Sequence, residues 1–130
     1  MITVSVRINR PSHVVWDYFT TIGNWRKWYG AALKEVTPAW QQGANLVWEK
    51  GGASPIIKFI RGAEIGVGGS GTDTTYQFSR ESDSVTVVKL IESDPKVGAQ
   101  SPGGDLGRKV ELEGKLLNLR LFVEAETKIV

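Results

Sequence analysis

The sequence contains no cysteine and a single histidine, His13, among its 130 residues. Without cysteine, neither a disulfide bond nor a thiolate metal site can form. One histidine excludes a multi-histidine metal site, and its place beside Ser12 in the first turn of an expected helix indicates a solvated residue. No loop has the spacing of acidic residues that calcium sites need. We therefore predict no metal, no cofactor and no catalytic residue.

Long apolar runs and clusters of one charge are missing as well. Charged residues interrupt every apolar stretch, and residues 1–9 alternate instead of forming a signal peptide. We expect no export signal, no membrane span and a cytoplasmic location, which the lack of cysteine also suits. The net charge is +2, and the basic residues are scattered among acidic ones. Nucleic-acid binding needs clustered basic residues, so we expect no nucleic-acid partner.

What is present suits one globular domain spanning residues 1–130. The hydrophobic fraction is 41% and the charged fraction is 23%, and a chain of this length buries one sizeable core. The unusual feature is the aromatic content, with five tryptophans, three tyrosines and four phenylalanines. So many rings require either a large core or an aromatic-lined cavity.

The first third of the chain predicts one strand and two short helices. Apolar residues alternate with polar ones over residues 2–8, which is typical of a half-buried strand. Pro11 and Ser12 suit a helix start, and apolar residues at helical spacing follow to about Thr21. After Gly23 the segment 25–29 predicts a second helical turn.

The middle of the chain predicts an antiparallel meander. Short glycine- or Ser-Asp-containing connections imply that consecutive strands pair. The expected strands lie at about 45–50, 54–61, 63–68, 72–80 and 83–93, which makes about six with the first strand. Residues 93–104 are rich in proline, glycine and serine and predict a loop that would suit a lid over a pocket.

The last element predicted is a long helix from about Asp105 to about Thr127. Its apolar positions form one stripe of Leu106, Val110, Leu117 and Leu121, widened by Leu112, Leu116, Leu119 and Val123. We expect this broad face to pack on the sheet. Gly114 within the helix costs about 1 kcal/mol relative to alanine, which suggests that another backbone or a ligand approaches there.

Four segments in this order resemble a known family. They are residues 8–16, with a proline and a Val-Trp pair, residues 25–29, Gly43 with Trp48 five positions later, and residues 116–124. The sequence resembles the START-like superfamily, which includes polyketide cyclases, aromatase/cyclases, plant pathogenesis-related proteins and lipid-transfer domains. The resemblance spans essentially the whole chain. It implies an α+β helix-grip fold, in which a curved antiparallel sheet wraps around the long C-terminal helix.

The resemblance also implies that a small apolar ligand lies between the sheet and that helix. Alternation places Leu46 with Trp48, and Tyr76 with Phe78, on inward faces that should point at Leu117 and Leu121. Trp28 and Tyr29 are placed near the opening of the ligand cavity. Lys50 or Tyr76 would orient a polar end of the ligand. The strand at 54–61 is ambiguous, and we favour Phe59 inward. The predicted ligand-binding residues are Trp28, Tyr29, Leu46, Trp48, Lys50, Phe59, Tyr76, Phe78, Leu117 and Leu121.

Gly66, Gly68 and Gly71 match the spacing of a dinucleotide-binding motif. That motif requires a helix after the glycines, whose N-terminus receives the pyrophosphate. A strand pattern follows Gly71 instead, so we interpret the glycines as a hairpin connection.

Three functions remain open from sequence. The first is noncatalytic carriage or sensing of a lipid, isoprenoid or polyketide-like molecule. The second is a polyketide cyclase or dehydratase-like enzyme, which would need a titratable group with a shifted pKa inside the cavity. The third is a protein-interaction module. We favour the first, because the sequence offers few candidate catalytic groups, and leave the ligand and the oligomeric state open.

Overall fold

The computed structural model describes residues 1–69, 72–93 and 104–127. The chain begins with β1 (Ile2–Ile8), α1 (Ser12–Phe19), the 3-10 turn η1 (Ile22–Asn24) and α2 (Trp25–Trp28). The strands β2 (Leu33–Thr37), β3 (Asn45–Trp48), β4 (Ala53–Ile60), β5 (Glu64–Val67), β6 (Thr74–Ser82) and β7 (Val85–Glu92) follow, and then the long helix α3 (Gly104–Glu126). The expected loop at 93–104 lies mostly outside the described residues.

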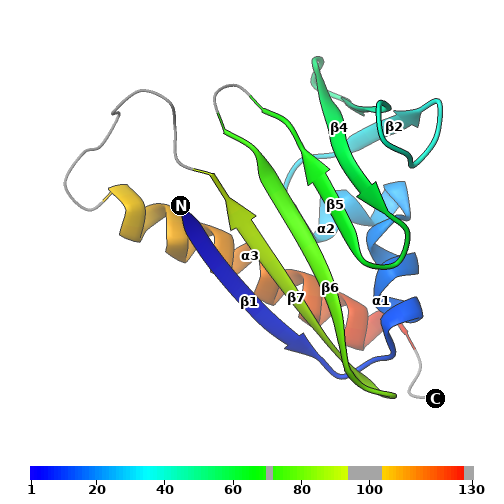
Figure 1. Ribbon diagram of the computed structural model, residues 1–130, viewed down its shortest axis with the longest axis vertical. Coiled ribbons are helices and arrows are strands. Elements are labelled where there is room, and N and C mark those ends of the chain that lie inside the picture. Colours follow the sequence, from blue (N-terminus) through cyan, green and yellow to red (C-terminus); the bar gives the residue numbers. More distant parts are fainter. Residues whose placement is uncertain (70–71, 94–103, 128–130) are drawn as a thin grey trace.

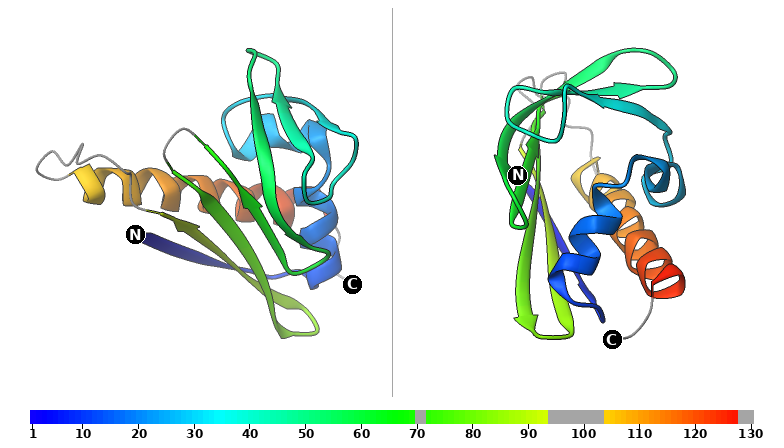
Figure 2. Two further views of the ribbon diagram at one scale, coloured as in Figure 1. Left: turned by 45° about the horizontal axis from the view of Figure 1, so that its top comes forward. Right: turned by 90° about the vertical axis from the view of Figure 1, so that its right-hand side faces the viewer.

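The strands form one seven-stranded antiparallel sheet in the order β1-β7-β6-β5-β4-β3-β2. Strand β1 forms one edge of the sheet and pairs with β7, so that Ile2 lies opposite Glu92 and Ile8 opposite Thr86. Figure 1 shows the meander with α3 behind it, and the right-hand view of Figure 2 shows the helices on one face of the curved sheet. This arrangement is the predicted helix-grip fold.

The seventh strand, β2, was not predicted. Its buried residues are Leu33 and Val36, which are 4% and 8% exposed. The pairing of β2 with β3 shifts register between Leu33 and Glu35. Because of this shift, Leu33 and Val36 lie on the same face although they are three positions apart. A β-bulge therefore hides the alternation by which a strand is recognised in a sequence.

A second bulge resolves the ambiguity in β4. The pairing with β5 shifts register between Ile56 and Lys58, so Ile56 and Phe59 both face inward although three positions separate them. Ile56 is 1% exposed, and the ring centroid of Phe59 lies 5.7 Å from that of Trp16. Ile57 and Ile60 are then left on the exposed side, at 45% and 48%. The preference for Phe59 inward was correct.

Gly66 in β5 and Gly68 just after it have a packing role. A Cβ atom at Gly66 would lie 3.2 Å from Cβ of Lys58, and one at Gly68 would lie 3.1 Å from Cγ of Pro55. The two glycines thus admit the side chains of the neighbouring strand β4. The next element, β6, is a strand, which agrees with a hairpin connection and not with a dinucleotide site; Gly71 lies outside the described residues.

Helix α3 buries only one of its two apolar stripes. The buried residues are 0–2% exposed and comprise Leu112, Leu116, Leu119 and Val123. The other stripe is exposed at 67%, 62%, 49% and 56% and comprises Leu106, Val110, Leu117 and Leu121. The expectation that Leu117 and Leu121 face the sheet was therefore wrong. A helix on a single sheet turns only part of its circumference inward, and sequence spacing does not decide which of two adjacent stripes that is.

The C-terminal end of α3 is held by the corner between β1 and α1. Arg10 is 6% exposed, and its guanidinium donates to the backbone oxygen of Glu124 at 2.5 Å and to Oγ1 of Thr127 at 3.0 Å. The backbone N–H of Asn9 donates to Oε2 of Glu124 at 2.8 Å. A cation at the C-terminal carbonyls of a helix is favourable because it satisfies free acceptors and complements the helix dipole.

Two leucines on opposite sides of α3 test this packing. We expect Leu119→Ala to lower the free energy of unfolding by about 2–5 kcal/mol, because it leaves a cavity in the core. Leu117→Ala, on the exposed side, should change it by less than about 1 kcal/mol. Urea unfolding followed by tryptophan fluorescence measures both values, and equal losses would show that α3 is rotated from its described position.

Candidate functional site

A cluster of buried aromatic rings fills the space where α1 and α2 meet the sheet. Phe19 lies at its centre, with ring centroids 5.1 Å from Trp25, 5.2 Å from Trp28, 4.9 Å from Tyr76 and 5.0 Å from Phe78. All five residues are less than 9% exposed. Rings in edge-on and tilted contact at these distances form a stiff wall.

The aromatic wall continues to the surface through two half-buried rings. Tyr29, just after α2, stacks on Trp48 of β3 with centroids 5.3 Å apart and planes 19° apart. Trp25 contacts Tyr29 from the core at 5.2 Å, and Nε1 of Trp48 donates to Oγ of Ser54 at 3.1 Å. Tyr29 and Trp48 are both half-buried and thus lie at the border between the core and solvent.

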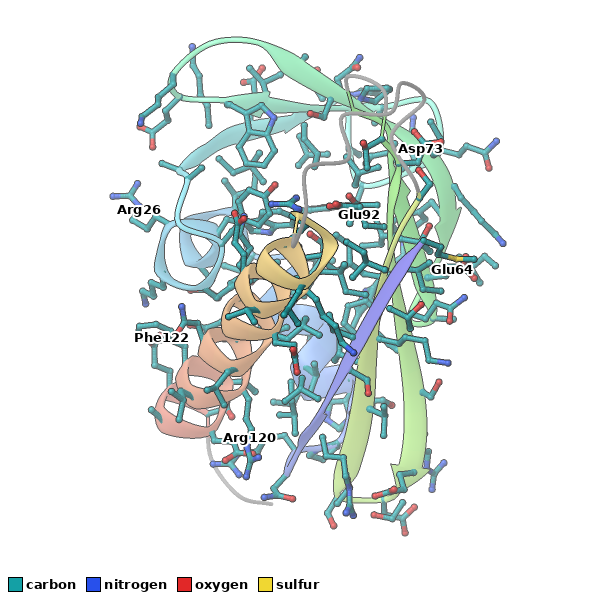
Figure 3. All side chains as sticks on the ribbon, turned by 90° about the vertical axis from the view of Figure 1, so that its left-hand side faces the viewer. Arg26, Glu64, Asp73, Glu92, Arg120 and Phe122 are labelled. Carbon is teal, nitrogen blue, oxygen red and sulfur yellow. The ribbon has the colours of Figure 1, made fainter. Side chains whose placement is uncertain are left out.

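An ion pair between a buried carboxylate and a partly exposed guanidinium lies next to this wall. Glu92, the last residue of β7, is 7% exposed and accepts hydrogen bonds from Nε and Nη2 of Arg108 at 2.9 and 2.6 Å. Figure 3 shows Glu92 between the sheet and the first turns of α3. Nη1 of Arg108 also lies 2.9 Å from Oε1 of Glu111. The hydrogen bond to Glu92 raises the pKa of Arg108 most strongly, although burial acts against it.

Two phenols share the electrostatic field of this ion pair. Burial raises the pKa of Tyr76 well above its ordinary value, electrostatic interactions with Tyr29 and Glu92 raise it further, and Arg108 lowers it. Burial is the largest effect on the pKa of Tyr29 and raises it, whereas the positive charge of Arg108 lowers it. Both phenols are therefore protonated at neutral pH and able to donate a hydrogen bond.

The next residue beside these groups is Lys115, about three helical turns from the start of α3. Its Nζ lies 3.9 Å from the centre of the Tyr29 ring, which is a cation–π contact. Burial lowers the pKa of Lys115, and the positive charge of Arg108 lowers it further. We refer to Tyr29, Tyr76, Glu92, Arg108 and Lys115 as the polar cluster.

The structure brings most of the predicted site residues to one place. Trp28, Tyr29, Trp48, Tyr76 and Phe78 belong to the connected aromatic rings, and Leu46 and Phe59 lie on the same inner face of the sheet. Trp28 is 1% exposed and so belongs to the core instead of the expected cavity opening. That these residues contact a ligand stays a prediction.

Three predicted residues lie elsewhere. Lys50 is exposed in the turn between β3 and β4, because β3 ends at Trp48. Leu117 and Leu121 lie on the outer side of α3. None of the three belongs to the polar cluster, so their predicted positions in the site are corrected.

Glu92, Arg108 and Lys115 were missed by sequence reasoning, although a signal was present. Val88, Leu90 and Glu92 alternate in β7, so Glu92 continues the buried face of its strand. A charged residue at an inward position requires a partner. Arg108 and Lys115 lie four and three positions from the buried Leu112, on its flank.

Two buried polar atoms have no hydrogen-bond partner among the described residues, Nε1 of Trp28 and the hydroxyl of Tyr18. Burial raises the pKa of the Tyr18 hydroxyl to about 12, and the nearby Glu126 carboxylate contributes to this increase. The contact between the hydroxyl and Glu126 does not have the geometry of a hydrogen bond among the described residues. Tyr18 belongs to α1 and its neighbour Glu126 to the end of α3, away from the polar cluster. The indole N–H of Trp28 is a buried donor beside Tyr29 and Tyr76.

Within the residues that the structure describes, no group of three His, Cys, Asp or Glu side chains is placed to hold a metal ion. Over the same residues, every helix is too short or too polar to cross a membrane.

No family model matches this chain, and no curated protein matches its sequence. Solved structures do match. The protein SSP2350 from Staphylococcus saprophyticus superposes with a TM-score of 0.76 and 20% identity over 98% of this chain and 94% of that one. DynU16, from the dynemicin biosynthetic locus, has a TM-score of 0.74 and 14% identity over 95% of this chain and 46% of its own. The Aha1 dimer from Colwellia psychrerythraea has a TM-score of 0.70 and 16% identity over 98% of both chains. These likenesses show the fold, which is the helix grip.

The ion pair can be tested by a double-mutant cycle. Arg108→Met should lower the free energy of unfolding by about 1–3 kcal/mol, because it leaves Glu92 buried without a partner; solvent screening of the partly exposed Arg108 reduces the loss. Adding Glu92→Leu should recover much of this loss. The exposed pair Arg7–Glu81, 2.6 Å apart, is the control, and Arg7→Met should cost less than about 1 kcal/mol. Equal effects at both sites would contradict the described burial of Glu92.

Proposed function

We propose that this chain binds a small, largely apolar molecule between its sheet and α3, with the polar end of the molecule at the polar cluster. The observation that carries the proposal is the ion pair between the buried Glu92 and the partly exposed Arg108 beside Tyr76. Apolar residues of similar shape often stabilise a core as well as or better than a buried ion pair does. A charged pair in an otherwise aromatic interior therefore suggests a role in recognition.

The aromatic wall supports the apolar half of the proposal. Tyr29 and Trp48 are half-buried and stacked on each other, and Tyr29 contacts Lys115 of the polar cluster. A ligand that buries roughly 200 Å² of apolar surface there would gain about 5 kcal/mol before the entropic cost of binding. The unpartnered N–H of Trp28 offers a hydrogen bond to an acceptor on the ligand. The fold supports the same reading, since DynU16 belongs to a biosynthetic locus.

Carriage or sensing of a lipid, isoprenoid or polyketide-like molecule is favoured over catalysis. An enzyme would need a titratable group with a shifted pKa near the ligand, and Tyr76 and Lys115 are two such groups. However, Arg108 engages Glu92, and His13 is exposed on α1. No carboxylate or imidazole of the described polar cluster is thus left as a general base.

Ligand binding can be measured with 1-aminoanthracene, a neutral fluorophore, and with native mass spectrometry of gently purified protein. Tyr29→Ala should weaken binding of the fluorophore about 10-fold, because it removes a stacking face. The control is Phe122→Ala, which removes another half-buried ring from the opposite end of α3 (Figure 3) and should leave binding unchanged. If no apolar probe binds and no ligand is carried through purification, the proposal is wrong.

A second candidate function, self-association, is favoured by the exposed stripe of α3. Leu106, Val110, Leu117 and Leu121 are each about half exposed or more. Their spacing is symmetric about the bond between Glu113 and Gly114. In an antiparallel pair of α3 helices with a two-fold axis at that bond, Leu106 would meet Leu121 of a second copy, and Val110 would meet Leu117. The self-complementary pattern therefore points to a second copy as the occupant.

Two further features of α3 suit such a pair. Nothing lies within 4 Å of a Cβ placed on Gly114, so a second backbone has room to approach. A hollow of about 340 Å³, lined by Met1, Ile2, Thr3, Leu106 and Lys109, lies at one end of the stripe, where Leu121 of the second copy would arrive. Four such side chains bury roughly 800 Å² between two copies, less than the about 1,200–2,000 Å² of stable complexes, so the dimer would be weak. The Aha1 of Colwellia psychrerythraea is described as a dimer.

Sedimentation velocity over a wide concentration range tests the self-association. We expect reversible dimerisation with a Kd in roughly the micromolar range or weaker. The double variant Leu117→Ser and Leu121→Ser should be monomeric at every concentration. The control is Ile57→Ser with Ile60→Ser, which removes two equally exposed residues from β4. A wild-type chain that stays monomeric throughout would rule out this second function.

A further inference from the structure

The two carboxylates of this region are both engaged by one cation. Glu92 accepts two hydrogen bonds from Arg108, and Glu111 lies 2.9 Å from another nitrogen of the same guanidinium. The planar guanidinium is suited to such multiple contacts, because its donors diverge in fixed directions. Among residues 1–69, 72–93 and 104–127, no carboxylate pairs with the second cation of the polar cluster, Lys115.

Lys115 is half-buried, and in the described part of the chain its ammonium has neither an ion pair nor a hydrogen bond to a protein acceptor. Its contact is the face of Tyr29, 3.9 Å from the ring centre. That ring is held in place by stacking on Trp48. An ammonium has three donors, and burying them without acceptors costs free energy. Burial indeed lowers the pKa of this lysine.

We infer that Lys115 binds the anionic end of the ligand and that this end is a monoanion, a carboxylate above all. The inference rests on the proposed function and names the chemical class of its ligand. A carboxylate would accept hydrogen bonds from the ammonium and from the protonated phenols of Tyr29 and Tyr76. The apolar body of the same molecule would lie on the rings of Tyr29 and Trp48.

The surrounding charges favour one negative charge on the ligand over two. Glu92 and Glu111 both act electrostatically on Lys115, so their carboxylates also act on an anion bound there. A phosphate monoester, with nearly two charges at neutral pH, would be repelled more strongly than a carboxylate. Lys115 therefore takes the role that the sequence assigned to Lys50, which lies in an exposed turn.

Matched ligands test the inference. Naphthalene-2-carboxylate, 2-naphthol and 2-naphthyl phosphate share one apolar body, and decanoate with 1-decanol repeats the comparison for an alkyl chain. Isothermal titration calorimetry at neutral pH should show each carboxylate binding about 10-fold tighter than the alcohol of the same body. The phosphate should bind more weakly than the carboxylate. Equal affinity of acid and alcohol, or a preference for the phosphate, would overturn the inference while leaving the proposed function intact.

Three variants show whether Lys115 is responsible. Lys115→Met should abolish most of the preference for the acid and leave the affinity for 2-naphthol nearly unchanged, whereas Lys115→Arg should keep the preference. Lys109→Met removes an exposed lysine of the same helix and should change neither. Circular dichroism confirms that each variant is folded. A preference for the acid that survives Lys115→Met would refute the assignment, and failure of all these ligands to bind would refute the proposed function with it.

Discussion

The contact on which the rest of the structure depends is the burial of one face of α3 against the concave side of the sheet. Leu112, Leu116, Leu119 and Val123 supply the apolar surface, and charged groups hold the two ends of the helix. Arg10 binds the last turn, and Glu92 binds the first turns through Arg108. Apolar burial supplies most of the free energy but is non-directional. The two polar attachments determine where along the sheet the helix lies.

This division of roles separates the interior into two parts. Aromatic rings around Phe19 fill the space under α1 and α2, whereas charged and phenolic groups occupy the space under the first half of α3. A purely structural domain gains little from charges in its interior, because their desolvation offsets much of their attraction. The border between the two parts is therefore where a molecule with an apolar body and an anionic end would lie. The outer face of α3, which the sheet leaves uncovered, is chemically distinct and suits a protein surface instead.

The order of the elements could be predicted because each carried a local pattern. The alternation in β1, the helical spacing of α1 and the glycine-containing turns of the meander all agree with the folded chain. Prediction failed where the local pattern was broken. A bulge moved Val36 out of alternation with Leu33 and concealed β2, and a similar bulge made the two faces of β4 look equally apolar. In both strands the extra residue is defined only by pairing with a neighbour.

The sequence by itself determined the order of the elements and the α+β class, because hydrophobic periodicity and turn residues are local properties. The helix grip was implied by the resemblance to the START-like superfamily, and most rings of the aromatic wall were among the predicted site residues. The tertiary structure alone decided two things. It selected which of two adjacent apolar stripes of α3 is buried, since a helix can rotate about its axis without changing its own pattern. It also assembled the polar cluster of Tyr29, Tyr76, Glu92, Arg108 and Lys115. These residues come from four separate segments of the chain and meet only when the sheet and α3 pack together.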